Sequence, residues 1–133
     1  MHHGVISVAS AGNDGQQANV YPAALAHVID VASTDNSDVQ SNFSNYGAPP
    51  VWLAAPGEAV MTTYPWGTWA AGWGTSFSTP LVTGTVAMML GRNGSCTASQ
   101  VSTALAQADW ISDPQVGHGR LNTYKALQYC ASH

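Results

Sequence analysis

Residues 74–90 read GTSFSTPLVTGTVAMML, a turn of small residues that leads into an apolar run. From Ser78 to Leu90 the run is almost entirely apolar, which predicts a helix that is buried on all sides. Pro80 fits such a helix only in its first turn, where a missing N–H costs nothing. Gly91 or Gly94 is then expected to end the helix.

Five short runs precede this helix, and each is predicted to be a strand because it is apolar and bounded by glycine, proline or polar turns. The runs span 5–9, 28–32, 51–55, 59–64 and 68–71. Two helices are expected after it, at about 97–108 and 123–130. The first of these opens on a capping box formed by Thr97 and Gln100. Strands followed by helices in this order predict an α/β chain.

So few strands cannot complete such a fold. They leave sheet edges unpaired and one sheet face uncovered, which predicts that the chain is part of a larger domain. Only 8% of the 133 residues are charged, against about 25% in typical soluble domains, which indicates that much of the surface is covered by something else.

Composition also excludes several classes of protein. Hydrophobic residues make up 45% of the chain, which argues against disorder. No stretch approaches the roughly 20 apolar residues that cross a bilayer. The net charge is −4, and the fixed cations are Arg92, Arg120 and Lys125 alone, so neither nucleic acid nor an anionic membrane is an expected partner.

The two cysteines, Cys96 and Cys130, do not have the spacing of metal ligands. A disulfide between them would close a loop of about 35 residues and could contribute roughly 3–4 kcal/mol. Two buried free thiols are the alternative, because the redox environment rather than spacing decides between them.

Two polar segments interrupt the apolar structure. Ala11-Gly12-Asn13-Asp14-Gly15 follows the first strand, at the edge where α/β sheets bind ligands. Gly74-Thr75-Ser76 begins the apolar helix and places the Ser76 hydroxyl beside free N–H groups, as acyl transfer requires. Taken singly, each segment is more often an ordinary turn or helix cap.

Together, Gly-Thr-Ser-x-Ser-x-Pro and an upstream Ala-Gly-Asn-x-Gly resemble the subtilisin-like serine protease family (subtilases, peptidase S8), thermitase-like members in particular. Further similar segments follow in the family's order at 21–23, 28–35, 42–47, 54–57, 62–65 and 118–122. The resemblance implies a subtilisin-like three-layer α/β fold, a parallel sheet with helices on both faces. Residues 1–133 would form the C-terminal portion of that catalytic domain.

The resemblance also implies roles for single residues. Ser76 would be the nucleophile that forms the acyl-enzyme, and the Asn13 amide with the Ser76 N–H would form the oxyanion hole. The Thr75 hydroxyl would support Asn13. The pocket for the residue before the scissile bond would be lined by Ser10, Ala11 and Gly12, with Val20 at its base. A valine there would narrow the pocket and favour small or medium side chains.

The family's Asp-(Thr/Ser)-Gly and His-Gly-Thr motifs do not occur in these 133 residues. His3-Gly4 is only superficially similar, because it runs straight into the first strand. His27 reads as structural, and His118 and His133 lie far downstream. The chain is therefore expected to carry the nucleophile and oxyanion hole without the other triad members.

Three interpretations remain open: an inactive C-terminal portion of a serine endopeptidase, a catalytically dead binding module, or a half that another chain complements. A polypeptide substrate is the implied partner, and the N-terminal portion of the catalytic domain is a further one. The family implies secretion, although no signal peptide is recognisable before the first strand.

No cofactor is expected, but structural calcium is common in the family. Asp35 and Asp38 could supply oxygen ligands, although acids in such positions more often cap turns. Asp14 and Asp30 are likewise expected to be turn and strand-end acids.

Overall fold

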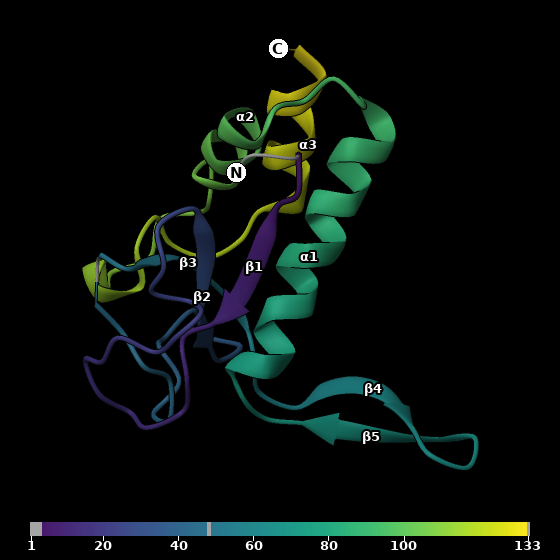
Figure 1. Ribbon diagram of the computed structural model, residues 1–133. Helices are drawn as coiled ribbons and strands as arrows, with labels where there is room; N and C mark the ends of the chain where they lie inside the picture. The colour runs from purple at the N-terminus through teal and green to yellow at the C-terminus, as the bar shows by residue number, and fades with distance from the viewer. Residues whose placement is uncertain (1–3, 48, 133) are drawn as a thin grey trace.

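The computed structural model describes residues 4–47 and 49–132. Three strands form a parallel sheet in the order β1-β2-β3, and a separate antiparallel hairpin, β4–β5, projects from the body (Figure 1). The strands are β1 (Ser7–Ser10), β2 (Val28–Thr34), β3 (Val51–Pro56), β4 (Val60–Tyr64) and β5 (Thr68–Gly72). The helices are α1 (Thr75–Arg92), α2 (Ala98–Leu105), the 3-10 helix η1 (Pro114–Val116) and α3 (Thr123–Ser132). The predicted α/β class is confirmed, and every predicted strand is present.

The parallel register brings the carboxyl ends of the strands to one edge of the sheet. Ser7 pairs with Val28 and Ser10 pairs with Val31, so β1 ends beside the middle of β2. All of β2 after its first residue is buried, as expected for a parallel strand that is covered on both faces.

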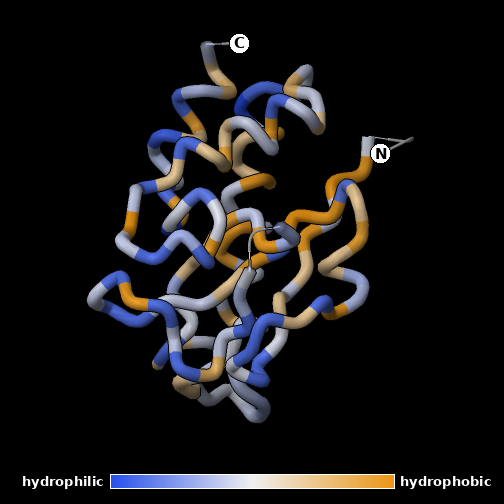
Figure 2. The backbone as a smooth tube through the Cα atoms, turned by 90° about the vertical axis from the view of Figure 1, so that its left-hand side faces the viewer, coloured by the Kyte–Doolittle hydropathy of each residue, from blue (hydrophilic) through white to orange (hydrophobic). Residues whose placement is uncertain are grey.

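Most of the core lies between one face of the sheet and the helices. Ile29, Val31 and Leu53 from the sheet belong to one buried cluster with residues of α1, α2 and α3. A smaller cluster on the other face includes Ala32 and Val116, so η1 and the segment before it cover that face in this chain. Figure 2 shows the apolar segments gathered in the middle of the molecule.

Helix α1 is buried on one side only. Val82 and Met89 are fully buried, whereas Leu81 is 39% exposed and Met88 is 50% exposed. The prediction of a helix buried on all sides is therefore wrong for this chain, because none of its described segments covers the outer side of α1.

That outer side continues into the free edge of the sheet. Strand β1 has β2 on one side and no strand on the other within the described residues. A cavity of ≈ 670 Å³ runs between β1 and α1 and is bordered by both. We call the β1 edge and the exposed side of α1 the open face; on α1 it comprises Leu81, Thr83, Gly84, Ala87 and Met88.

The limits of α1 also differ from those expected. The helix begins at Thr75 because the Asn13 side chain accepts the Thr75 N–H at 2.8 Å, an interaction that no local pattern predicts. Pro80 therefore lies in the second turn, where it leaves the Ser76 carbonyl without its usual helical donor. The helix ends at Arg92, with Asn93 as its C-cap, so neither Gly91 nor Gly94 ends it.

Near the C-terminus, the predicted capping box is confirmed. The Thr97 hydroxyl accepts from the Gln100 N–H at 3.2 Å, and the Gln100 side chain accepts from the Thr97 N–H at 2.8 Å. Cys96 and Cys130 form a disulfide with a Cα–Cα distance of 6.2 Å, which ties the start of α2 to α3. Among the helices of the described ranges, none is long and apolar enough to cross a membrane.

Candidate active site

Ser76 lies at the second position of α1, exposed at the carboxyl edge of the sheet. Gly74 is the N-cap, with φ 145°, and has no side chain to cap the helix. Of the first N–H groups, that of Thr75 is bound by Asn13, and that of Phe77 donates to the Gly74 carbonyl at 3.0 Å. The Ser76 N–H has no hydrogen-bond partner in the described part of the chain, so it can receive an oxygen from outside.

Asn13 is the second exposed polar group at this edge. Its Oδ1 accepts from both the backbone N–H and the hydroxyl of Thr75, each at 2.8 Å. Since Oδ1 is occupied in this way, Nδ2 remains as the free donor beside the start of α1. A Cβ placed on Gly74 would lie 3.6 Å from that Nδ2. Asn13 Nδ2 and the Ser76 N–H are therefore the two free donors that the described residues place at the start of α1.

The Thr75 hydroxyl connects the two segments. It is fully buried, it accepts from the Gly12 N–H at 3.2 Å, and it donates to Asn13 Oδ1. With its backbone N–H on the same oxygen, Thr75 fixes the orientation of the Asn13 amide.

The other predicted site residues lie around the same edge. Ser10 and Ser76 both border the ≈ 670 Å³ cavity of the open face. Ala11 is buried, and Gly12 has φ +102°, which a side chain would disfavour. A Cβ on Gly12 would lie 3.1 Å from a methyl group of Val20, so Val20 packs beside Gly12 and does not border that cavity.

Sequence reasoning missed Asn45, which holds the loop after β1 in shape. Asn45 is completely buried, and its Oδ1 accepts from the Asp14 N–H at 2.9 Å. Its Nδ2 donates to the Ala11 carbonyl at 3.1 Å and to the Asp14 carboxylate at 3.1 Å. Asn45 lies in a polar, Ser/Asn-rich stretch, and the only signal there was that an Asn can satisfy several backbone groups at once.

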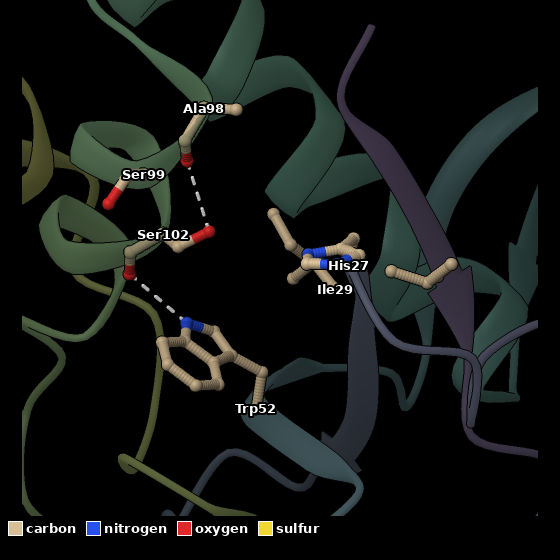
Figure 3. Close-up of a pocket in the computed structure, with 7 residues that line it drawn as sticks. His27, Ile29, Trp52, Ala98, Ser99 and Ser102 are labelled. Carbon is tan, nitrogen blue, oxygen red and sulfur yellow. Dashed lines mark hydrogen bonds between the residues drawn. The ribbon is translucent and has the colours of Figure 1, made fainter. Parts of the chain in front are cut away.

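The two described imidazoles lie at the opposite edge of the sheet. His27 precedes β2 and faces a cavity of ≈ 480 Å³ between Trp52 and α2 (Figure 3). The His118 ring packs edge-on against Trp52, with ring centroids 4.5 Å apart. The seven residues of β2 extend about 20 Å from this edge to the other. Neither ring can therefore accept the Ser76 proton, while His3 and His133 lie outside the described residues.

Two carboxyl groups have altered acidity. Asp30 lies inside β2 and is 2% exposed, so the prediction of a strand-end acid is wrong. Burial raises its pKa to about 6, against a weaker opposing effect of the Val31 backbone hydrogen bond. Hydrogen bonds from Lys125 and then Asn122 lower the pKa of Asp109, with Arg120 adding to the effect. Neither carboxyl group borders the Ser76 cavity.

The residues considered for calcium do not fit that ion. Asp35 Oδ1 already accepts the N–H groups of Ser37 at 2.7 Å and Val39 at 3.0 Å, as a turn cap does. Asp38 pairs with Arg120 at 2.6 Å. Within the described ranges there is no group of three or more His, Cys, Asp or Glu side chains that could hold a metal.

Sequence comparison relates this chain to known proteins. Residues 1–124 match the Subtilase family, peptidase S8. The chain is 43% identical over 129 residues to thermitase of Thermoactinomyces vulgaris, a match that covers 95% of this chain and 45% of thermitase. It is 35% identical over 127 residues to a thermostable alkaline protease of Halalkalibacterium halodurans, covering 94% of this chain and 35% of that protein.

Solved structures are also similar to this chain over nearly its whole length. The prenylagaramide maturation protease PagA superposes with a TM-score of 0.87 at 28% identity, covering 98% of this chain and 52% of PagA. The self-cleaved protease domain of PatA gives a TM-score of 0.82 at 31% identity, covering 92% of this chain and 49% of that domain. The chain thus spans about half the length of these relatives, or less. The family match and the fold agree, and the chain belongs to the subtilase family of serine proteases.

Proposed function

We propose that the complete protein is a serine endopeptidase that hydrolyses peptide bonds through an acyl-enzyme on Ser76. One observation carries this proposal. Thr75 holds Asn13 by its oxygen, which leaves Asn13 Nδ2 free at the start of α1, where the Ser76 N–H is also without a partner among the described residues. Two donors next to an exposed hydroxyl are the arrangement that acyl transfer needs.

In the proposed reaction, Ser76 Oγ attacks the carbonyl carbon of the scissile bond and gives its proton to a histidine base. The carbonyl oxygen becomes an oxyanion that accepts from Asn13 Nδ2 and the Ser76 N–H. The C–N bond then breaks, the protonated base supplies a proton to the leaving amine, and the acyl group stays on Ser76. Water, activated by the same base, attacks this ester and releases Ser76 for another cycle.

The start of α1 would favour these steps, because the positive end of the helix dipole stabilises negative charge close to it. Ser10, Ala11 and Gly12 would line the pocket for the residue before the scissile bond. Val20 would narrow this pocket and favour small or medium side chains. Rates measured on otherwise identical Ala-, Leu- and Phe-type substrates test that preference, which a faster Phe-type substrate would contradict.

The Asp and His of the triad would come from outside these 133 residues. In subtilisin, a member of the same family, loss of the histidine costs about 10⁶-fold in turnover. The isolated chain is therefore expected to be almost inactive. The open face supports the view that a further segment, the N-terminal portion of the catalytic domain, covers β1 and α1. Whether that portion belongs to the same chain or to a separate one, it would present the two residues to Ser76.

A fluorophosphonate probe, read by intact mass, tests the proposal. The complete gene product should gain one adduct, located on Ser76, and its Ser76→Ala variant should gain none. The 133-residue chain alone should remain unlabelled. If the complete product contains both triad motifs and is not labelled, the protein is a binding module rather than a protease. Labelling of the isolated chain would show that a base within it reaches Ser76, against the proposal.

We also propose a polypeptide as the substrate and an extracellular location. The disulfide between Cys96 and Cys130 supports that location, since such bonds persist in oxidising compartments. Fractionation of the producing cells, with the protein detected by mass spectrometry, distinguishes a secreted product from a retained one.

A further inference from the structure

The loop that carries Asn13 is held on both sides of that residue by one buried side chain, that of Asn45. Asn45 Nδ2 donates to the Ala11 carbonyl at 3.1 Å, two residues before Asn13. Asn45 Oδ1 accepts the N–H of Asp14, the residue after Asn13, at 2.9 Å. The same oxygen accepts the Gln16 N–H at 3.3 Å. The Asn45 carboxamide therefore spans the stretch of backbone that carries the Asn13 side chain.

Asn45 also holds Gly12, the residue directly before Asn13. The Asn45 N–H donates to the Gly12 carbonyl at 2.9 Å. A Cβ on Gly12 would lie 2.5 Å from Asn45 Nδ2, so the carboxamide occupies the space that a side chain at Gly12 would need. The loop and the Asn45 side chain thus fit each other closely on this side of Asn13.

Asn45 is in turn fixed to the end of β2. The hydroxyl of the neighbouring Ser44 accepts the Ser33 N–H at 2.9 Å and donates to the Asn45 carbonyl at 2.9 Å. The hydroxyls of Ser33 and Ser41 bond to each other at 2.8 Å, and all four residues are buried. Buried networks whose members are bonded in this way are rigid. Asn45 therefore ties the position of the Asn13 loop to that of the sheet.

The partners of this side chain require an amide. Its oxygen accepts two N–H groups, and its nitrogen donates to two oxygens, the Ala11 carbonyl and the Asp14 carboxylate, each at 3.1 Å. An aspartate at position 45 would keep both acceptor bonds. It would also place a carboxylate against the Ala11 carbonyl and the Asp14 carboxylate. Because an unsatisfied or repelling polar group is costly at a completely buried site, the loop should shift to relieve it.

Such a shift would reach the Asn13 amide in spite of Thr75. The two Thr75 hydrogen bonds orient Asn13 Oδ1 from the side of α1, but the rest of the side chain moves with its own backbone. Donors of an oxyanion hole act because they are already in place where negative charge develops. A displacement of about 1 Å can cost on the order of 10²-fold in rate.

We propose that Asn45 is a positioning residue for the reaction, which sets the place of Asn13 Nδ2 at the start of α1 and so the strength of the oxyanion hole. The described partners of its side chain belong to residues 11–16, so Asn45 acts through Asn13 and not on the substrate. The inference rests on the proposed function of Ser76 and Asn13. The hydrogen bonds that carry it lie within the described residues and do not depend on what covers the open face.

The test variant is Asn45→Asp in the complete protein. Its kcat, expressed per folded molecule from circular dichroism, should fall about 10–100-fold. Asn122→Asp is the matched control, because Asn122 Nδ2 also donates to a carboxylate, that of Asp109, at 3.0 Å. Asn122 Oδ1 likewise accepts a backbone N–H, that of Lys125, at 3.0 Å. This control introduces the same charge outside the Asn13 loop and should change kcat by less than about twofold.

A double-mutant cycle with Asn13→Ala separates positioning from a general loss of structure. Once the Asn13 amide is absent, Asn45→Asp should lower kcat by less than about twofold. Asn45→Ser, which keeps one donor and one acceptor, should give a smaller loss in the parent and follow the same cycle, so the test does not depend on the folding of Asn45→Asp. Equal losses with and without the Asn13 amide would overturn the proposal, as would equal losses in Asn45→Asp and Asn122→Asp.

A second measurement does not use activity. The NMR signal of the Asn13 side-chain amide, identified by its loss in Asn13→Ala, should shift in Asn45→Asp and stay in place in Asn122→Asp. An Asn13 signal and a kcat that are both unchanged in Asn45→Asp would contradict the positioning role. If the signal shifts but the parent protein neither hydrolyses peptides nor reacts with a fluorophosphonate, the proposed function is wrong and the positioning of Asn13 stands.

Discussion

At the scale of single residues, Asn13 has two separable tasks, because its oxygen binds Thr75 and its nitrogen remains free. Asn13→Asp keeps the acceptor for Thr75 and removes the donor. In the complete protein we expect kcat to fall by about 10²–10³-fold with little change in KM, the size of effect that loss of this kind of donor has in subtilisin. Steady-state kinetics on one peptide substrate provide the measurement.

Two variants of Thr75 test whether its hydroxyl is needed to hold the Asn13 amide. Thr75→Ser keeps the hydroxyl that bridges Gly12 and Asn13 and should retain most activity, whereas Thr75→Val loses that bridge and should lose activity through a misplaced amide. Equal activity of Thr75→Val and Thr75→Ser would show that Asn13 does not need this support.

The buried carboxyl group of Asp30 should make the stability of the fold depend on pH. Burial raises its pKa from 3.8 to about 6, so within that window the folded state binds more protons than the unfolded state. Stability therefore falls as pH rises from about 4 to about 6, and the loss persists above that range. A shift of about two units corresponds to about 3 kcal/mol at most.

Asp30→Asn removes this titration. Denaturant unfolding gives the free energy of unfolding of the parent and of the variant. The difference, variant minus parent, should grow by up to about 3 kcal/mol between pH 4 and pH 7. A difference that stays constant over this range would mean that Asp30 titrates normally in the folded state.

At the scale of elements, the start of α1 and the root of the hairpin depend on Gly57. A Cβ there would collide with the hydroxyls of Ser33 and Ser78 and lie 2.8 Å from the Gly74 carbonyl. Gly57→Ala should therefore destabilise the chain by about 1–3 kcal/mol through overpacking and should displace the turn that holds Ser76. Thermal unfolding measures the first effect, and fluorophosphonate labelling of the complete protein measures the second.

Gly67→Ala is the control for substitution in the hairpin, since a Cβ at Gly67 has no atom within 4 Å, although its φ of +71° will cost some stability. Labelling of Ser76 should survive Gly67→Ala and fall with Gly57→Ala. If both variants label like the parent, the position of the nucleophile does not depend on the hairpin root.

The elements also show what the sequence could and could not predict. Strand positions and the Thr97 capping box were predictable, because short apolar runs and caps are local signals. The beginning of α1 was not, because it is set by Asn13, which lies 62 residues away in the sequence. Asn45 and Asp30 were missed for the same reason, since the burial of a polar residue depends on distant segments.

At the scale of the whole molecule, the covering segment proposed above would explain both the low content of charged residues and the open face. A charged fraction of 8% predicted that part of this surface is covered, and the residues that the structure describes leave one side of α1 and one edge of β1 without cover. The family resemblance supplied the identity of the site, because the separate motifs around Asn13 and Ser76 are each too common to do so alone. The sequence could not predict which side of α1 stays exposed, since all sides of that helix carry apolar residues.

The open face can be tested with two matched threonines. Thr83 on the open face of α1 and Thr103 on α2 are both exposed, and each hydroxyl donates to the carbonyl four residues earlier, at 3.1 Å and 3.0 Å. In the isolated chain, Thr83→Lys and Thr103→Lys should each change the free energy of unfolding by less than about 0.5 kcal/mol, as surface substitutions do.

In the complete protein the two substitutions should differ. If a further segment covers the open face, Thr83→Lys buries an unpaired ammonium beside the Ser76 cavity, which costs several kcal/mol, whereas Thr103→Lys stays in water. Melting temperature and fluorophosphonate labelling should therefore fall for Thr83→Lys alone. If both variants melt and label like the parent, no segment covers this side of α1, and the triad residues would have to reach Ser76 by another route.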